Sequence, residues 1–133
     1  MIRLMRLEYL EDLESQTPRV LLTYGNDPRD AVVLRRSVDE LAAGKTHKVR
    51  VDQLPGFQKV AGCSLVLSVG SLDSGVERFG GPDPAFRCEL SPLTWKRVSG
   101  LLEPFERAKE PDGFQYLTET GSIEWIISRS RSW

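Results

Sequence analysis

Histidine is almost absent from this chain, and cysteine is scarce. His47 is the single histidine, and Cys63 and Cys88 are the only cysteines among 133 residues. A Ser-His-Asp or Cys-His catalytic group would have to use His47, which lies in a polar stretch flanked by lysines. None of these three residues has the short spacing with which one loop presents two ligands to zinc. We therefore expect no catalytic histidine and no metal site.

Glycine patterns that bind nucleotide phosphates are also missing. The eleven glycines form neither GxxxxGKS/T nor a GxGxxG that opens a helix. Carboxylate pairs such as Asp39 with Glu40 occur, but any chain with 28% charged residues contains them. We name no catalytic, cofactor-binding or metal-binding residue and expect no cofactor, and we favour a protein that is not an enzyme.

The chain has no basic excess. It carries 18 Lys and Arg against 19 Asp and Glu, for a net charge of −1. Proteins dedicated to nucleic acids usually carry a positive surplus, because cationic contacts to phosphates supply their affinity. We do not expect a nucleic-acid partner. Weak contact through Arg129, Arg131 and the basic residues between 29 and 50 is therefore only the third hypothesis for function.

Long apolar runs are missing as well. Nowhere do about eighteen apolar residues follow one another, and acidic residues begin at Glu8, which leaves no apolar core for a secretory signal. These absences predict a cytoplasmic protein without membrane contact. Since thiols stay reduced in that compartment, we expect Cys63 and Cys88 to be free and buried.

What is present is the composition of an ordinary folded domain. Hydrophobic residues make up 40% of the chain, and its length is typical of one domain. No internal repeat, low-complexity segment or long linker divides it. We predict a single globular domain over residues 1–133.

Alternating and β-rich segments, separated by turn-forming residues, predict most of the strands. The predicted strands are residues 20–24, 49–52, 63–69, 86–90, 114–118 and 123–128, and 76–79 is a candidate return strand. Residues 2–9 are open between a strand, which we favour, and a helix, because their apolar positions fit neither period. The segments 114–118 and 123–128 flank a short polar stretch, 119–122, and form a predicted hairpin. Residues 27–36 are open between two interpretations: a strand over 31–36 that pairs back on 20–24, or a helix with Asp27 as N-cap and Pro28 in its first position.

Two helices are predicted from their start signals. The capping-box pattern from Ser37 to Glu40 predicts a short helix over 38–43 that ends at Gly44. Ser91 and Pro92 begin the main helix, 92–109, whose apolar stripe has Val98, Leu102 and Phe105 at its centre. Pro104 lies inside this run and predicts a kink or a restart.

Together these elements predict an α+β fold. We expect a mostly antiparallel twisted sheet of five to seven strands, with one face covered by the main helix in the C-terminal half and by the short second helix. Strands grouped in meanders argue against alternating βαβ units.

The C-terminus is the one unusual stretch of the sequence. Serine and arginine alternate there before a terminal tryptophan, so Arg129, Arg131 and Trp133 are the candidate partner-binding residues. The alternative is a frayed tail, or a tryptophan that folds back on the core.

For function, the leading hypothesis is a non-catalytic cytosolic binding or protein-interaction domain with an unidentified protein partner. The first alternative is a small metal-independent hydrolase or lyase that uses Asp, Glu and Arg. A concave cluster of carboxylates and arginine would favour the enzyme, and an apolar surface with a polar rim would favour the interaction protein. The sequence does not indicate an oligomeric state.

Overall fold

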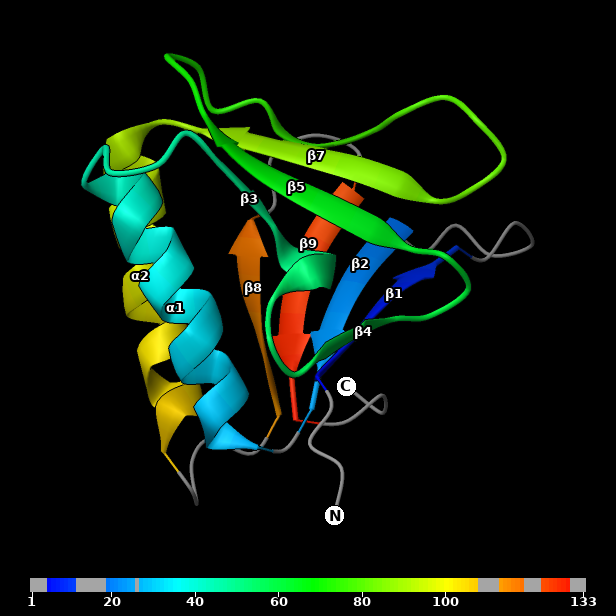
Figure 1. Ribbon diagram of the computed structural model, residues 1–133, viewed down its shortest axis with the longest axis horizontal. Helices are drawn as coiled ribbons and strands as arrows, with labels where there is room; N and C mark the ends of the chain where they lie inside the picture. The colour runs from blue at the N-terminus through cyan, green and yellow to red at the C-terminus, as the bar shows by residue number, and fades with distance from the viewer. Residues whose placement is uncertain (1–4, 12–18, 26, 108–112, 119–122, 130–133) are drawn as a thin grey trace.

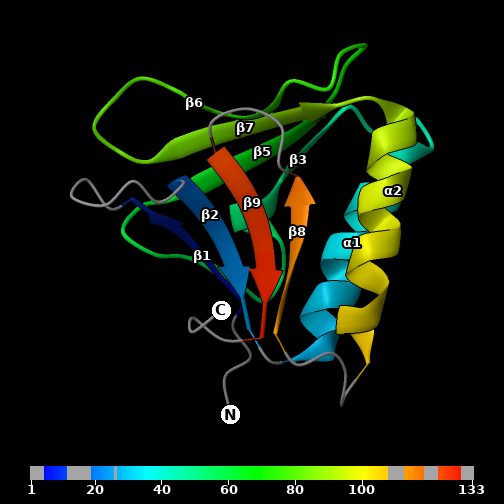
Figure 2. The same ribbon diagram turned by 180° about the vertical axis from the view of Figure 1, so that it is seen from behind.

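The computed structural model describes residues 5–11, 19–25, 27–107, 113–118 and 123–129. Within them the chain forms two mixed β-sheets, of five and four strands, and two α-helices. The α+β class is therefore confirmed. The strands of one sheet cross those of the other, and the two helices run side by side along one side of both sheets (Figures 1 and 2).

The larger sheet, sheet A, has the strand order β4-β1-β2-β9-β8. Its strands are β1 (Met5–Leu10), β2 (Arg19–Tyr24), β4 (Phe57–Lys59), β8 (Phe114–Thr118) and β9 (Ile123–Ser128). β1 pairs with β2 and β8 with β9 in antiparallel fashion, which confirms the predicted hairpin. The two pairs are joined by a parallel contact between β2 and β9. From Val20 to Tyr24 the residues of β2 are buried on both faces of the sheet, as suits its mostly apolar sequence.

The smaller sheet, sheet B, has the strand order β3-β5-β7-β6. Its strands are β3 (Lys48–Arg50), β5 (Ser64–Val69), β6 (Gly75–Arg78) and β7 (Ala85–Leu90). β5 and β7 are parallel, and β6 returns along β7 and not along β5. A 3-10 turn, η1 (Val51–Gln53), takes the place of the second half of the predicted 49–52 strand.

The prediction of one mostly antiparallel sheet is matched only in part, because both sheets are mixed. The described strands form two sheets, and three strand pairs are parallel: β1 with β4, β2 with β9, and β5 with β7. Alternation along a strand reports which face is buried, but it carries no information about which strand lies beside it. The parallel partners are far apart in sequence, so local pattern could not identify them.

One helix, α1 (Pro28–Ala42), covers the whole region that the sequence left open. Asp27 is its N-cap and accepts a hydrogen bond from the Arg29 amide (3.0 Å), which settles residues 27–36 as helix. The strand over 31–36 is therefore wrong. So is the start at Ser37, whose hydroxyl donates to the Val33 carbonyl inside the helix (3.3 Å). The predicted end is confirmed, since Gly44 follows the C-cap in the left-handed conformation (φ 75°).

The second helix, α2 (Pro92–Leu102), begins as predicted. The Ser91 hydroxyl caps it by accepting from the Thr94 amide (3.4 Å). A 3-10 turn, η2 (Glu103–Glu106), follows at Pro104, which confirms the restart. Val98, Leu102 and Phe105 are buried as expected.

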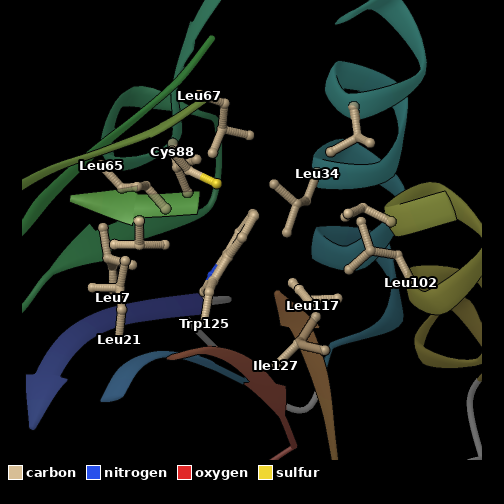
Figure 3. Packing of buried hydrophobic residues seen from close by; sticks show 14 of the residues in the cluster. Leu7, Leu21, Leu34, Leu65, Leu67, Cys88, Leu102, Leu117, Trp125 and Ile127 are labelled. Atoms are coloured by element: carbon tan, nitrogen blue, oxygen red, sulfur yellow. The ribbon is translucent and has the colours of Figure 1, made fainter. Parts of the chain in front are cut away.

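The core lies between the two sheets and the helices. Trp125 of β9 stands at its centre, among leucines of sheet A, Cys88 and leucines of sheet B, and Leu34 of α1 (Figure 3). Its indole nitrogen donates to the Thr23 hydroxyl (2.9 Å), and its ring meets that of Trp95 edge to face at 6.5 Å. Cys63 and Cys88 are free and buried, as predicted.

None of the helices in the described part of the chain is long and apolar enough to cross a membrane.

Candidate functional site

Of the three residues predicted in the C-terminal tail, only Arg129 belongs to the described part of the chain. Its guanidinium donates to the Arg107 carbonyl (2.6 Å) and lies over the Phe105 ring, 5.9 Å from the ring centre. These contacts join the end of β9 to the turn after α2. Arg131 and Trp133 lie outside the described residues, so their role in partner binding stays a prediction.

Several of the basic residues between 29 and 50 are already bound to carboxylates. Arg29 pairs with Asp27 (2.8 Å), Arg35 with Glu106 (2.6 Å), and Arg50 with Asp52 (3.5 Å). Carboxylates beside these guanidinium groups lower the positive potential that phosphates would meet. The arrangement gives little support to a nucleic-acid surface here.

The thiols are unsuited to nucleophilic chemistry. Burial, helped by the negative charge of Asp52, raises the pKa of Cys63 to about 12. Burial raises the pKa of Cys88 as well. Both groups are therefore protonated at neutral pH, whereas a reactive cysteine needs a lowered pKa and access to solvent.

A buried serine lies in a polar network between the helices. The Ser99 hydroxyl donates to Asp39 (2.5 Å) and accepts from the Arg35 guanidinium (3.1 Å), which also binds Glu106. Ser99 of α2 is 5% exposed, its two partners belong to α1, and Glu106 of η2 extends the network through Arg35. The network holds the helices together.

His47 is exposed, and no three His, Cys, Asp or Glu side chains in the described ranges lie close enough together to hold a metal ion.

The clearest concave surface lies between α2 and the edge strand β8. This α2–β8 groove has a volume of about 380 Å³ and is lined by Thr94, Arg97, Val98, Leu101, Gln115, Tyr116, Leu117 and Thr118. The four helical residues follow the spacing i, i+3, i+4, i+7, so they form one face of α2. The other four are consecutive residues of β8. Figure 2 shows β8 between β9 and the helices, so that its free edge faces them.

The backbone of Tyr116 points to that free edge. The Ser128 carbonyl accepts from the Gly25 amide (3.1 Å), so Ser128 and, by alternation, Ile126 turn their backbone groups towards β2. Tyr116 is paired with Ile126 in the register of β8 and β9. Its own N–H and C=O must therefore point away from β9, into the groove. The carbonyl is occupied there by a side chain, the Gln115 amide (3.0 Å).

The accessible lining of the groove is more polar than apolar, its most deeply buried lining residues are apolar, and its rim carries one positive charge. Val98 and Leu117 are buried at 1% and 4% exposure, Leu101 is half-buried, and Arg97 is exposed. A β-bulge interrupts the pairing of β8 with β9 between Tyr116 and Thr118, a feature frequent at sheet edges and beside binding sites. No carboxylate and no histidine is among the lining residues.

This groove was not predicted from the sequence. No role was assigned to Arg97, and residues 114–118 were predicted only as one half of a hairpin. The helical spacing of Thr94, Arg97 and Leu101 indicates that these residues share one face of the helix. This spacing does not show that the free edge of a strand lies opposite, because the position of that edge depends on the strand order.

No protein-family model, curated protein or solved structure matches this chain, so the site rests on its own geometry.

Proposed function

We propose that the protein is a non-catalytic interaction domain that binds an extended segment of a partner protein in the α2–β8 groove. The observation that carries the proposal is the edge of β8: Tyr116 directs its backbone N–H and C=O into a groove with an apolar floor. A segment that lies there can add to sheet A as a further strand, with main-chain hydrogen bonds for affinity and side-chain pockets for specificity.

The dimensions of the groove suit a short stretch of extended chain. From Thr94 to Leu101 the helical wall rises roughly 10 Å at 1.5 Å per residue. From Gln115 to Thr118 the strand wall also spans roughly 10 Å at 3.3 Å per residue. Both lengths correspond to about three residues of an extended segment.

Because α2 flanks the edge of β8, a single extended segment fits the groove better than the edge of a second sheet does. An uncovered edge strand invites pairing with any other sheet edge, and proteins guard such edges with bulges, side chains or a covering element. β8 has all three guards: its bulge, the Gln115 amide on the Tyr116 carbonyl, and α2 alongside. An incoming backbone N–H would replace the Gln115 amide at that carbonyl, so this hydrogen bond is exchanged and not lost.

The lining residues support binding over catalysis. A hydrolase or lyase that works with Asp, Glu and Arg needs at least one carboxylate beside its substrate. The groove has Arg97 and neutral side chains only.

The test is a titration of the whole protein, labelled with ¹⁵N, with blocked pentapeptides rich in β-branched residues. We expect the amide resonances of Gln115–Thr118 and of α2 to shift on binding. In the variant Leu101→Arg, a longer charged side chain enters the groove, and affinity should fall by at least about tenfold. Arginine and leucine have similar helix propensities, so α2 should remain intact.

Leu93→Arg is the matched control. Leu93 lies on the same helix, is 79% exposed and does not line the groove, so its replacement should leave affinity unchanged. A second variant, Tyr116→Pro, removes an N–H that points into the groove and is not bonded to β9, and it should also abolish binding. The proposal is overturned if no peptide binds at millimolar concentration, or if the shifted resonances lie away from α2 and β8.

A further inference from the structure

Arg97 is the one charged residue among those that line the α2–β8 groove. Neither wall supplies a negative charge to it. α2 reads PLTWKRVSGLL and β8 reads FQYLT, without a single Asp or Glu. The helical neighbours of Arg97 at i±3 and i±4 are likewise uncharged, so no acidic residue is in place for an ion pair along α2.

This isolation contrasts with most arginines of the described chain. Those with a carboxylate partner are Arg19, Arg29, Arg35, Arg50, Arg78, Arg87 and Arg107. Within the described ranges Arg97 makes neither an ion pair nor a hydrogen bond. Within those ranges no partner engages its five N–H donors at the mouth of the groove.

We propose that the segment bound in the groove carries a carboxylate, and that Arg97 binds this carboxylate while an apolar side chain of the same segment packs on Val98, Leu101 and Leu117. The inference rests on the proposed function and adds the chemical class of the partner. A guanidinium presents two parallel N–H groups to the two oxygens of a carboxylate, and this geometry selects an acidic group over a neutral amide.

The carboxylate can belong to a Glu or Asp side chain or to the C-terminus of the partner. Both sources offer the same two oxygens to Arg97. They differ in the path of the partner chain beyond the acidic group, because a C-terminal segment ends inside the groove and an internal one continues past it.

The experiment compares four pentapeptides on the full chain by fluorescence anisotropy. Three are blocked at both ends and carry glutamate, glutamine or lysine at the central position between β-branched residues. The fourth carries central glutamine and a free C-terminal carboxylate as its only charge. We expect the glutamate peptide, the free-carboxylate peptide or both to bind between about threefold and tenfold more tightly than the blocked glutamine peptide. This preference should weaken as salt is added.

Substitutions of Arg97 should then change the preference and not the fold. In Arg97→Gln the acidic and neutral peptides should bind equally, and in Arg97→Glu the lysine peptide should become the tightest. Lys96→Gln is the matched control, since Lys96 is an exposed cation on the same helix that does not line the groove. It should leave the preference of the parent protein intact.

Failure of this inference is distinguishable from failure of the proposed function. If all four peptides bind the parent and Arg97→Gln equally, while Leu101→Arg still weakens binding, the groove binds peptides without recognising a carboxylate and the inference is wrong. If none of the four binds the parent protein, both the inference and the proposed function are overturned. A preference that survives in Arg97→Gln would assign the recognition of the acid to another residue and would also overturn the inference.

Discussion

At the scale of single residues, Asp73 connects the loop after β5 to the start of α2. Its carboxylate accepts hydrogen bonds from the Ser91 amide (2.7 Å) and the Thr94 hydroxyl (2.8 Å). These bonds, that from Ser91 foremost, lower the pKa of Asp73 below its ordinary value of 3.8. Because Thr94 also lines the α2–β8 groove, this carboxylate helps to place one end of the candidate site.

Replacement of Asp73 by alanine should make stability depend on pH in a specific way. A carboxyl group whose pKa is lower in the folded state stabilises the fold above its unfolded pKa, and this contribution disappears as pH falls through the folded pKa. We expect Asp73→Ala to melt a few degrees below the parent at pH 7, with a gap that closes between about pH 4 and pH 2. Thermal melts followed by circular dichroism over this range measure the gap.

Asp83→Ala is the matched control, because Asp83 is exposed and, within the described residues, makes no hydrogen bond. Its melting temperature should stay close to that of the parent at every pH. A gap for Asp73→Ala that is the same at pH 7 and pH 2 would contradict the role assigned to the carboxylate.

At the scale of elements, α2 serves two surfaces at once. Its inner face contributes Trp95, Val98 and Leu102 to the core, and Trp95 also donates from its indole nitrogen to the Ser68 carbonyl of sheet B (2.9 Å). The adjoining face, from Thr94 to Leu101, forms one wall of the groove. The rigidity of that wall therefore depends on core packing, which suits a site that must be in place before its ligand arrives.

Truncation of Leu102, which is fully buried, should destabilise the protein strongly. We expect Leu102→Ala to lower the free energy of unfolding by about 2–5 kcal/mol, since both transfer and cavity terms are lost. Leu93→Ala makes the same chemical change on the exposed side of the same helix and should cost less than about 0.5 kcal/mol. Urea titrations measure both values, and equal costs would mean that Leu102 does not face the core.

At the scale of the whole molecule, the two sheets share one core. Trp125 of sheet A lies against Cys88 and the leucines of sheet B, and the helices close one side of the space between the sheets (Figure 3). A smaller cluster of Val20, Leu22, Tyr24 and Ile126 belongs to sheet A alone. Since the main core is shared by both sheets, we expect the two to open together and not one after the other.

The two buried thiols report on the sheet B side of this core, since Cys88 lies in β7 and Cys63 directly precedes β5. In native protein at pH 8, an alkylating reagent should modify neither Cys63 nor Cys88 at the rate of a free thiol, because both are buried and have raised pKa values. In denaturant without reductant, mass spectrometry should find both modified. Just below the unfolding midpoint the two should react at one common rate. Fast modification of only one thiol in native protein would instead mean that the chain around that thiol opens locally.

Most of the secondary structure of this protein is determined locally. Ser91 with Pro92 begins α2, Gly44 ends α1, and alternation defines strands such as β5 and β7, because capping and periodicity act over a few neighbouring residues. Where two local signals competed, at 27–36, packing decided: Ala31, Leu34 and Val38 face the core only if this stretch is helical.

The arrangement of these elements and the candidate site were decided by the tertiary structure. β2 and β9 pair although about a hundred residues separate them, and hydrogen bonds between distant strands leave no trace in the pattern of either one. The edge position of β8 follows from this pairing, and with it the outward N–H and C=O of Tyr116 and the setting of Arg97. The sequence by itself determined an apolar face on each element, because each element must bury one face in the core. Only the folded chain determined which strand edge stayed unpaired beside the guanidinium of Arg97.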